Sequence, residues 1–210
     1  SAAEESYRRG TRLHESGNFA GALVAFDASL QAAPDVAAVH YGRGSALAML
    51  RRLEEAVQAF ARCIEIEPGH VGALYNQATA LALLQRWQDA LAVLDGIVAK
   101  FPAMADAWNN RAGVLQALGR TEEGLDSAMR VLQLRPSDPR ALYGAGLMLL
   151  LLKRFDEAER VLARALDFNP GNGDILGSLV AAALRACDWE TIERLLPRIV
   201  SAIQDGSAAV

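Results

Sequence analysis

Five prolines, each 34 residues from the next, constrain the fold of this chain more than any other sequence feature. They are Pro34, Pro68, Pro102, Pro136 and Pro170. Two stretches with helical periodicity, joined by a short turn, precede each proline. Because proline cannot continue the backbone hydrogen-bond ladder, it ends the second helix. A fixed period of this length is typical of repeat arrays, so the sequence predicts stacked helix pairs.

Further residues align when each repeat is numbered so that its proline is position 32. The repeats then begin at Ala3, Ala37, Val71, Ala105, Pro139 and Gly173. Position 8 holds the small residues Gly10, Gly44, Ala78, Ala112 and Gly146. Position 11 holds Leu13, Leu47, Leu81, Leu115 and Leu149. Position 20 holds Ala22, Ala56, Ala90 and Ala158, and position 24 holds Phe26, Phe60, Leu94 and Leu162.

This pattern resembles the tetratricopeptide repeat, which has a large residue at position 4, Gly or Ala at 8, Ala at 20 and Pro at 32. The resemblance covers five complete repeats and a degenerate sixth. It implies an all-α fold, a right-handed superhelical solenoid of about six helix pairs. In the fourth repeat, positions 20 and 24 are Gly124 and Ala128, so we expect that repeat to be the least stable.

The first helix of each repeat, helix A, has two distinct faces. At about 100° per residue, positions 4, 8 and 11 lie within about 60° of one another, which predicts the core stripe. Positions 2, 6, 9 and 13 point roughly opposite, with position 5 on their flank. In tetratricopeptide proteins this opposite face lines the concave groove, so its residues are candidates for binding an extended protein or peptide segment.

Aromatic residues recur at position 5 of helix A. All four tyrosines occupy it, and Asn109 replaces tyrosine in the fourth repeat. Two compatible interpretations remain open. The ring packs against helix A of the neighbouring repeat, or it offers contact area and a hydroxyl group to a bound peptide. The tyrosines are Tyr7, Tyr41, Tyr75 and Tyr143.

Position 6 holds asparagine in two repeats, Asn76 and Asn110. An amide side chain both donates and accepts hydrogen bonds, so it can hold the backbone of an extended chain. In the fifth repeat, the groove face is instead apolar, with Leu147, Leu150 and Leu151. That stripe indicates either a docking site or burial between helices. The predicted binding groove consists of Tyr41, Tyr75, Asn76, Asn109, Asn110, Tyr143 and Leu147.

Two sets of arginines also recur. The first lies at the turn between the helices, with carboxylates close behind, and suits the dipoles of the two helix ends. It consists of Arg52, Arg86, Arg120 and Arg154. The second lies at position 7 and is expected to form ion pairs between repeats or, alternatively, to contact a ligand. It consists of Arg9, Arg43 and Arg111.

Composition and motifs argue against several other functions. The net charge is −4, whereas nucleic-acid-binding domains usually carry a basic excess. The longest apolar run, residues 141–152, is shorter than the about 20 residues that span a bilayer. The histidines are scattered and Cys63 and Cys187 have no ligand spacing, so we expect no metal, no cofactor and no catalytic site. A cytoplasmic location, in a reducing compartment, is expected.

The end of the chain departs from the repeat. Residues 1–186 form the predicted array, and residues 187–210 read as a degenerate last helix and a junction to a missing C-terminal domain. Pro197 is expected to kink or divide this helix near Leu196. Its many apolar residues should leave some apolar surface uncovered, so the terminal repeats could self-associate. These residues are Trp189, Ile192, Leu195, Leu196, Ile199, Val200 and Ile203.

The run RACDWETIERLL, residues 185–196, resembles the segment that closes the repeat region of bacterial O-GlcNAc transferase-like proteins of the SPINDLY type. The AWNNRAGVLQALGR segment, residues 107–120, is similar to repeats common in that group. The resemblance implies that this chain is the substrate-recruiting arm of such a protein and that its glycosyltransferase domain would cover the last helix, with Trp189 and Ile199 near the seam. The alternative is a free-standing adaptor or assembly scaffold.

Overall fold

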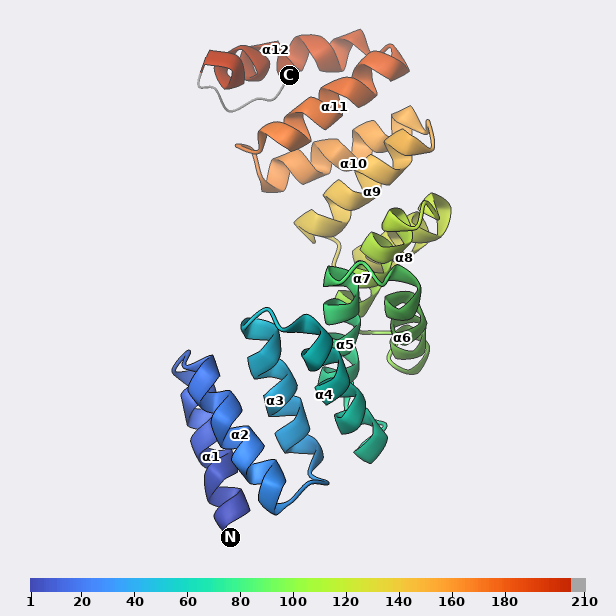
Figure 1. Ribbon diagram of the computed structural model, residues 1–210. Helices are drawn as coiled ribbons and strands as arrows, with labels where there is room; N and C mark the ends of the chain where they lie inside the picture. The colour runs from blue at the N-terminus through green and yellow to red at the C-terminus, as the bar shows by residue number, and fades with distance from the viewer. Residues whose placement is uncertain (205–210) are drawn as a thin grey trace. The chain divides into compact units, whose positions relative to one another are not determined.

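The structure, a computed structural model, describes residues 1–204 of the chain, apart from the side chains of residues 202 and 203. Within residues 1–204 there are twelve helices and no strand, which confirms the predicted all-α class (Figure 1). The helices are α1 (Ala2–Glu15), α2 (Phe19–Ala32), α3 (Ala37–Met49), α4 (Leu53–Ile66), α5 (Val71–Leu83), α6 (Trp87–Lys100), α7 (Ala105–Ala117), α8 (Thr121–Leu134), α9 (Pro139–Leu151), α10 (Phe155–Phe168), α11 (Gly173–Ala186) and α12 (Trp189–Gln204).

The chain divides into two compact units, the N-terminal unit of Ser1–Pro102 and the C-terminal unit of Ala103–Val210. The two helices of each repeat contact each other. Within each unit, helix B of one repeat also packs against helix A of the next, as α2 does against α3 and α8 against α9. An A helix inside a unit is therefore covered on two sides.

Each of the five repeated prolines follows a helix end, as predicted. Helix α2 ends at Ala32, two residues before Pro34, and α10 ends at Phe168, two residues before Pro170. One residue stands between the last helical residue and the proline; in the first repeat it is Ala33, whose backbone is extended with ψ at 91°. This is the conformation that a following proline favours. The proline thus sets where helix B stops and where the next repeat begins.

The turn inside each repeat has a backbone requirement that the sequence analysis missed. The residue at position 15 has a positive φ, between 57° and 79°, in all six repeats. Such left-handed residues commonly end helices and favour glycine. Only two of the six are glycine. They are Gly17, Arg51, Gln85, Gly119, Lys153 and Cys187.

The turn arginines immediately precede the B helices rather than ending helix A. Arg52 lies just before α4, and its guanidinium holds the Glu55 carboxylate through two hydrogen bonds of 2.7 Å. That hydrogen bond lowers the pKa of the Glu55 carboxyl. The same pairing recurs between Arg86 and Asp89, Arg120 and Glu123, and Arg154 and Glu157. These arginines therefore organise helix starts, as the structural interpretation expected.

Positions 8 and 24 of a repeat pack directly against each other. A Cβ atom built on Gly44 would lie 2.7 Å from the ring of Phe60, and one on Gly146 would lie 2.5 Å from Leu162. Phe60 and Leu162 are fully buried. Where position 24 is Leu94, position 8 is the buried Ala78. The small residue at position 8 thus makes room for the large residue of helix B.

Helix A buries more positions than the predicted stripe of 4, 8 and 11. Position 4 is only half-buried at His40 and Leu74, whereas positions 3 and 10 are buried throughout repeats two to six. In repeats two, three, five and six, the reason is the contact of helix A with helix B of the preceding repeat, which adds a second buried face. The buried residues are Val39, Ala73, Ala107, Ala141 and Ile175 at position 3, and Ala46, Ala80, Val114, Met148 and Ala182 at position 10.

The small residue Gly124 of the fourth repeat is covered by a side chain of the fifth repeat. A Cβ atom on Gly124 would lie 3.2 Å from the sulfur of Met148 and 3.2 Å from the Ala112 carbonyl oxygen. Met148, from the fifth repeat, is 2% exposed, and Ala128 is 1% exposed. Met148 therefore packs beside position 20 of this repeat, where the other complete repeats carry alanine. The expectation that the fourth repeat is the least stable stays a prediction.

Pro197 does not divide the last helix, so of the two outcomes expected from the sequence the division is wrong, and the kink stays a prediction. Helix α12 runs without a break from Trp189 to Gln204. Proline removes one backbone donor and frees the carbonyl of residue 193. Pro197 and Glu193 are both exposed, so water can satisfy that carbonyl while the turns on either side remain bonded.

Helix α12 has one buried and one uncovered apolar face. Leu195 is 4% exposed and Ile199 packs against the same core. Trp189, Leu196 and Val200 are 62%, 48% and 50% exposed. At about 100° per residue, Leu196 and Val200 lie within about 20° of Trp189 around the helix axis, so the three side chains share one face. The expected uncovered surface is present, but Ile199 belongs to the buried face. The side chain of Ile203 lies outside the described residues.

Candidate functional site

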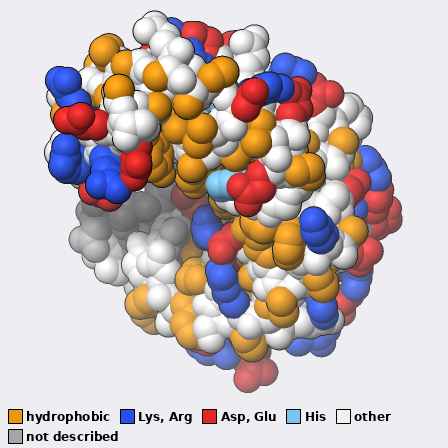
Figure 2. Space-filling view, turned by 90° about the horizontal axis from the view of Figure 1, so that it is seen from below, with side chains coloured by type: hydrophobic (Ala, Val, Ile, Leu, Met, Phe, Trp, Pro, Cys, Tyr) orange, Lys and Arg blue, Asp and Glu red, His pale blue; other side chains and the backbone are white. Residues whose placement is uncertain are grey.

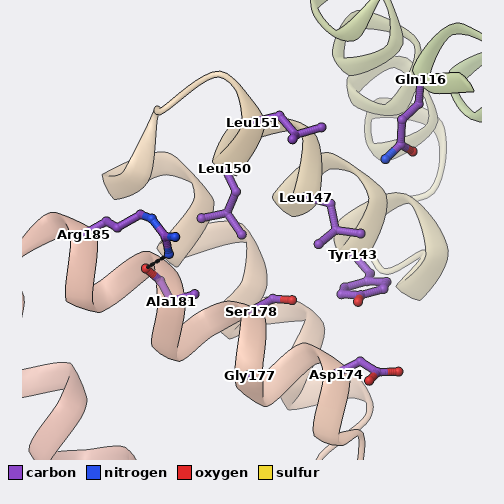
Figure 3. A pocket seen from close by; sticks show the side chains of 10 residues that line it. All are labelled: Gln116, Tyr143, Leu147, Leu150, Leu151, Asp174, Gly177, Ser178, Ala181 and Arg185. Carbon is purple, nitrogen blue, oxygen red and sulfur yellow. Dashed lines mark hydrogen bonds between the residues drawn. The ribbon is translucent and has the colours of Figure 1, made fainter. Parts of the chain in front are cut away.

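A hollow of about 610 Å³ lies along α9 and α11 in the C-terminal unit, and we call it the leucine hollow. In Figure 3, Leu147 and Leu150 of α9 point toward α11. The facing positions of α11 hold Gly177, Ser178 and Ala181, which are too small to cover the leucines. The lining consists of Gln116, Tyr143, Leu147, Leu150, Leu151, Asp174, Gly177, Ser178, Ala181 and Arg185.

Charged side chains lie at the two ends of the leucine hollow. Figure 3 places Arg185 beside Leu150 at one end and Asp174 below Tyr143 at the other. The Arg185 guanidinium donates to the carbonyl of Ala181 at 3.2 Å. Both charged residues are exposed, and within residues 1–204 neither forms an ion pair. Their charges are available at opposite ends of an apolar surface.

A second hollow, of about 590 Å³, lies along α3 and α5, and we call it the N-terminal hollow. Its polar side chains include Tyr41 and Asn76, whose Oη and Nδ2 atoms are 3.4 Å apart. His14 of α1 borders it, and its Nε2 atom is buried without a hydrogen-bond partner in the described part of the chain. Met49 and Leu83, 58% and 55% exposed, line it as well. This hollow combines hydrogen-bonding groups with exposed apolar side chains.

Tyr41, at position 5 of the second repeat, makes the packing contact with the neighbouring repeat that one interpretation expected. The Tyr41 ring centroid lies 6.0 Å from that of Phe60 and 4.6 Å from that of His70, at the start of the next repeat. Tyr41 also lines the N-terminal hollow, and Tyr143 lines the leucine hollow. Packing and a contact with a peptide therefore remain compatible roles for these two residues.

The other predicted groove residues are distributed between the two units. Tyr75 and Asn76 belong to α5, and Asn109 and Asn110 belong to α7. Asn76 lines the N-terminal hollow, whereas Tyr75, Asn109 and Asn110 are half-buried and line neither hollow. The role of each asparagine in peptide binding stays a prediction.

Two of the three position 7 arginines, Arg43 and Arg111, hold helices together, whereas Arg9 is exposed. Arg43 of α3 forms an ion pair of 2.7 Å with Asp27 of α2, in the preceding repeat, as expected. Arg111 donates to the Ser127 hydroxyl at 2.6 Å and lies over the ring of Trp108. These contacts occupy both guanidinium groups within the protein.

Sequence reasoning missed two features of the hollows. Position 13 of helix A is an exposed apolar residue in three repeats: Leu151 was predicted on the groove face, but the equivalent Met49 and Leu83, 58% and 55% exposed, were not. Their 34-residue spacing could have revealed this. Asp174 and Arg185 were missed because each also suits its own end of helix α11, so the sequence gives no sign that both border a hollow.

Other kinds of site find little support among residues 1–204. Within that range, no group of three or more His, Cys, Asp or Glu side chains is placed to hold a metal ion, and no helix has the length and apolarity needed to cross a membrane. Burial raises the pKa of the Cys63 thiol, which disfavours a reactive thiolate.

Figure 2 shows one face of the molecule, on which Lys and Arg side chains are interspersed with Asp and Glu.

The sequence matches the family model described as Tetratricopeptide repeat over residues 7–71, 62–105, 75–139 and 114–173. No curated protein matches the chain.

Several solved structures are similar to this fold. MamA from Desulfovibrio magneticus RS-1 has a TM-score of 0.77 at 21% identity, over 81% of this chain and 96% of that one. A tetratricopeptide repeat protein from Parabacteroides merdae has a TM-score of 0.80 at 15% identity, over 100% and 81%. YrrB, described as a TPR protein with an unusual peptide-binding site, has a TM-score of 0.72 at 22% identity, over 79% and 85%. At these identities, the likeness concerns the fold.

Proposed function

The chain belongs to the tetratricopeptide repeat family, and from that premise we propose that it is a scaffold that binds an extended polypeptide on the groove faces of its A helices. The observation that carries the proposal is the leucine hollow, where α9 leaves leucines uncovered opposite small residues of α11. Uncovered apolar surface of this kind marks interaction sites in soluble proteins. The peptide-binding site named for YrrB adds support from a protein of the same fold.

Polar groups of the N-terminal hollow supply the second part of the argument. Among residues 1–204, the side-chain hydrogen bond of Asn76 is a long one of 3.4 Å to Tyr41, so its amide can turn to a peptide backbone at little cost in free energy. His14 Nε2 is a buried group without a partner in the described part of the chain. Such a group favours a ligand that donates to it or accepts from it. Backbone recognition would make binding tolerant of peptide sequence at this hollow.

The asparagines provide a direct test. Peptides enriched on the protein from a displayed library of random linear peptides should bind the Asn76→Ala/Asn110→Ala variant more weakly. Each hydrogen bond lost to the peptide costs about 1 kcal/mol, which corresponds to roughly a fivefold rise in Kd. The measurement is fluorescence anisotropy with a labelled peptide.

The matched control is Gln58→Ala/Gln88→Ala, which removes two exposed amides from the B helices α4 and α6. Its affinity for the same peptide should equal that of the wild type. Unchanged binding in a folded asparagine variant would show that Asn76 and Asn110 have a purely structural role.

We further propose that the array is the substrate-recruiting arm of an O-GlcNAc transferase-like protein, joined to the catalytic domain beyond residue 187. The sequence similarity of residues 185–196 and the exposed stripe of Trp189, Leu196 and Val200 support this. Part of the similarity has a simpler cause. Cys187 fills the left-handed position of the turn, and the Asp188 carboxylate accepts from the backbone N–H of Thr191 at 3.1 Å, as an N-cap does.

The coding sequence beyond Val210 distinguishes the two assignments. A glycosyltransferase domain in frame after residue 210 is the expected result, and that domain should bury Trp189. A stop codon or an unrelated domain would favour the alternative, a free-standing adaptor or assembly scaffold that uses the α12 stripe for self-association.

A further inference from the structure

We propose that the leucine hollow selects an extended segment in which an aliphatic residue stands between an acidic and a basic residue. Arg185 would pair with the acidic side chain, Asp174 with the basic one, and the leucines of α9 with the aliphatic one. This inference rests on the proposed function, because it specifies the chemistry of the partner at one part of the groove.

The aliphatic preference follows from the composition of the two facing helices. Position 9 of helix A is Thr11, Ser45, Thr79 or Gly113 in the first four repeats, but Leu147 in the fifth. Leu147 and Leu150 are half-buried and Leu151 is 63% exposed. Burying this surface against another apolar side chain removes it from water, which is favourable in proportion to its area.

Space for such a side chain is provided by α11. Gly177 and Ser178 line the hollow across from the leucines (Figure 3). A glycine and a serine project little beyond the backbone, so a partner chain can approach α11 closely. Tyr143 borders the same space and offers a hydroxyl group to a peptide backbone.

The spacing of the two charges sets the register of the partner. The Arg185 guanidinium turns back to the carbonyl of Ala181, so its charge lies about seven residues along α11 from Asp174, on the order of 11 Å. An extended chain advances about 3.3 Å per residue and presents alternate side chains to one face. Acidic and basic residues four positions apart, about 13 Å, therefore fit, with the aliphatic residue midway between them.

A simpler role for these charges makes a different prediction. An acidic residue at the start of a helix and a cationic residue at its end both interact favourably with the helix dipole and so stabilise the helix. If that were the only role of Asp174 and Arg185, exchanging their charges would lower the stability of α11 and leave peptide preference unchanged. A measurement of sequence preference therefore separates the two roles.

The experiment is a selection of random linear decapeptides, displayed on phage, on the whole protein. Peptides selected on the wild type should share an acidic, an aliphatic and a basic residue at positions i, i+2 and i+4. The acidic and basic residues should stand in the same order along the chain in all of these peptides. Asp174→Lys/Arg185→Glu should enrich the opposite charge order. It should also bind the peptide selected on the wild type about tenfold more weakly, because both ion pairs become like-charge contacts.

Two further sets of variants serve as controls. Arg160→Glu reverses an exposed charge on α10, outside the lining of the hollow, and should leave the enriched sequences unchanged. Arg185→Gln and Asp174→Asn should each weaken binding without reversing the preferred order. These neutral variants keep the test valid if the double reversal unfolds α11, which circular dichroism would reveal.

The outcomes distinguish this inference from the function on which it rests. If the wild type enriches aliphatic peptides without a charge order, or if the reversed variant keeps the same order, the inference is wrong and peptide binding stands. If the wild type enriches no peptide, the proposed function fails, and the inference fails with it.

Discussion

Replacing Leu81 with alanine should lower the unfolding free energy of the protein by about 2–5 kcal/mol, as truncation of a core leucine does. Leu81 holds position 11 of the third repeat and is 3% exposed. Helix α5, which carries it, is packed between α4 and α6, so the lost methyl groups leave a cavity that neither neighbour can easily fill. Urea unfolding followed by circular dichroism at 222 nm measures the loss.

The same helix supplies the control. Leu83, two residues later, is 55% exposed, and Leu83→Ala removes the same atoms without creating a cavity. Its cost should stay below about 1 kcal/mol. Equal losses in the two variants would contradict the assignment of position 11 to the core and position 13 to the groove. Because repeats stabilise their neighbours, the Leu81→Ala loss should reach beyond the third repeat in hydrogen-exchange measurements.

Gly44→Ala should destabilise the protein, although glycine to alanine in a helix normally stabilises it by about 0.5–1 kcal/mol. The new Cβ atom would lie 2.7 Å from the Phe60 ring, which is fully buried. Overpacking of this kind costs about 1–3 kcal/mol, so it outweighs the gain in helix propensity. Thermal and urea unfolding should both show the loss.

Two controls make the cause specific. Gly113, in α7, has nothing within 4 Å of a built Cβ atom, so Gly113→Ala should gain about 0.5–1 kcal/mol. Gly44→Ala/Phe60→Leu recreates the pair found at Ala78 and Leu94, and should recover part of the loss of Gly44→Ala. A stabilised Gly44→Ala variant would contradict the steric coupling of positions 8 and 24.

The period, the helix ends and the pairing of small with large residues were predictable because each is local to one repeat. Proline at position 32 ends helix B through its own backbone chemistry, and Gly44 and Phe60 belong to one helix pair. The faces of helix A were only partly predictable. In repeats two, three, five and six, helix B of the preceding repeat buries positions 3 and 10 of helix A, a contact that the phase of a single helix does not include.

Features that depend on two repeats were the ones missed. Met148 fills the space beside Gly124 from the following repeat, which no pattern within repeat four could indicate. Asp174 and Arg185 each have a sufficient local reason at the ends of α11. Their position at opposite ends of the leucine hollow emerges only when α9 packs beside α11. Binding hollows of a repeat array lie between repeats, so the candidate site was less predictable than the fold.

Hydrogen–deuterium exchange with a peptide selected on the protein tests the central claim, polypeptide binding on the groove faces of the A helices, most directly. Binding should slow exchange in α9 and α11, or in α3 and α5, the helices that line the two hollows. Exchange in the B helices α4 and α10 should change little. Protection confined to the B helices or to α12, with the groove helices unaffected, would contradict the account.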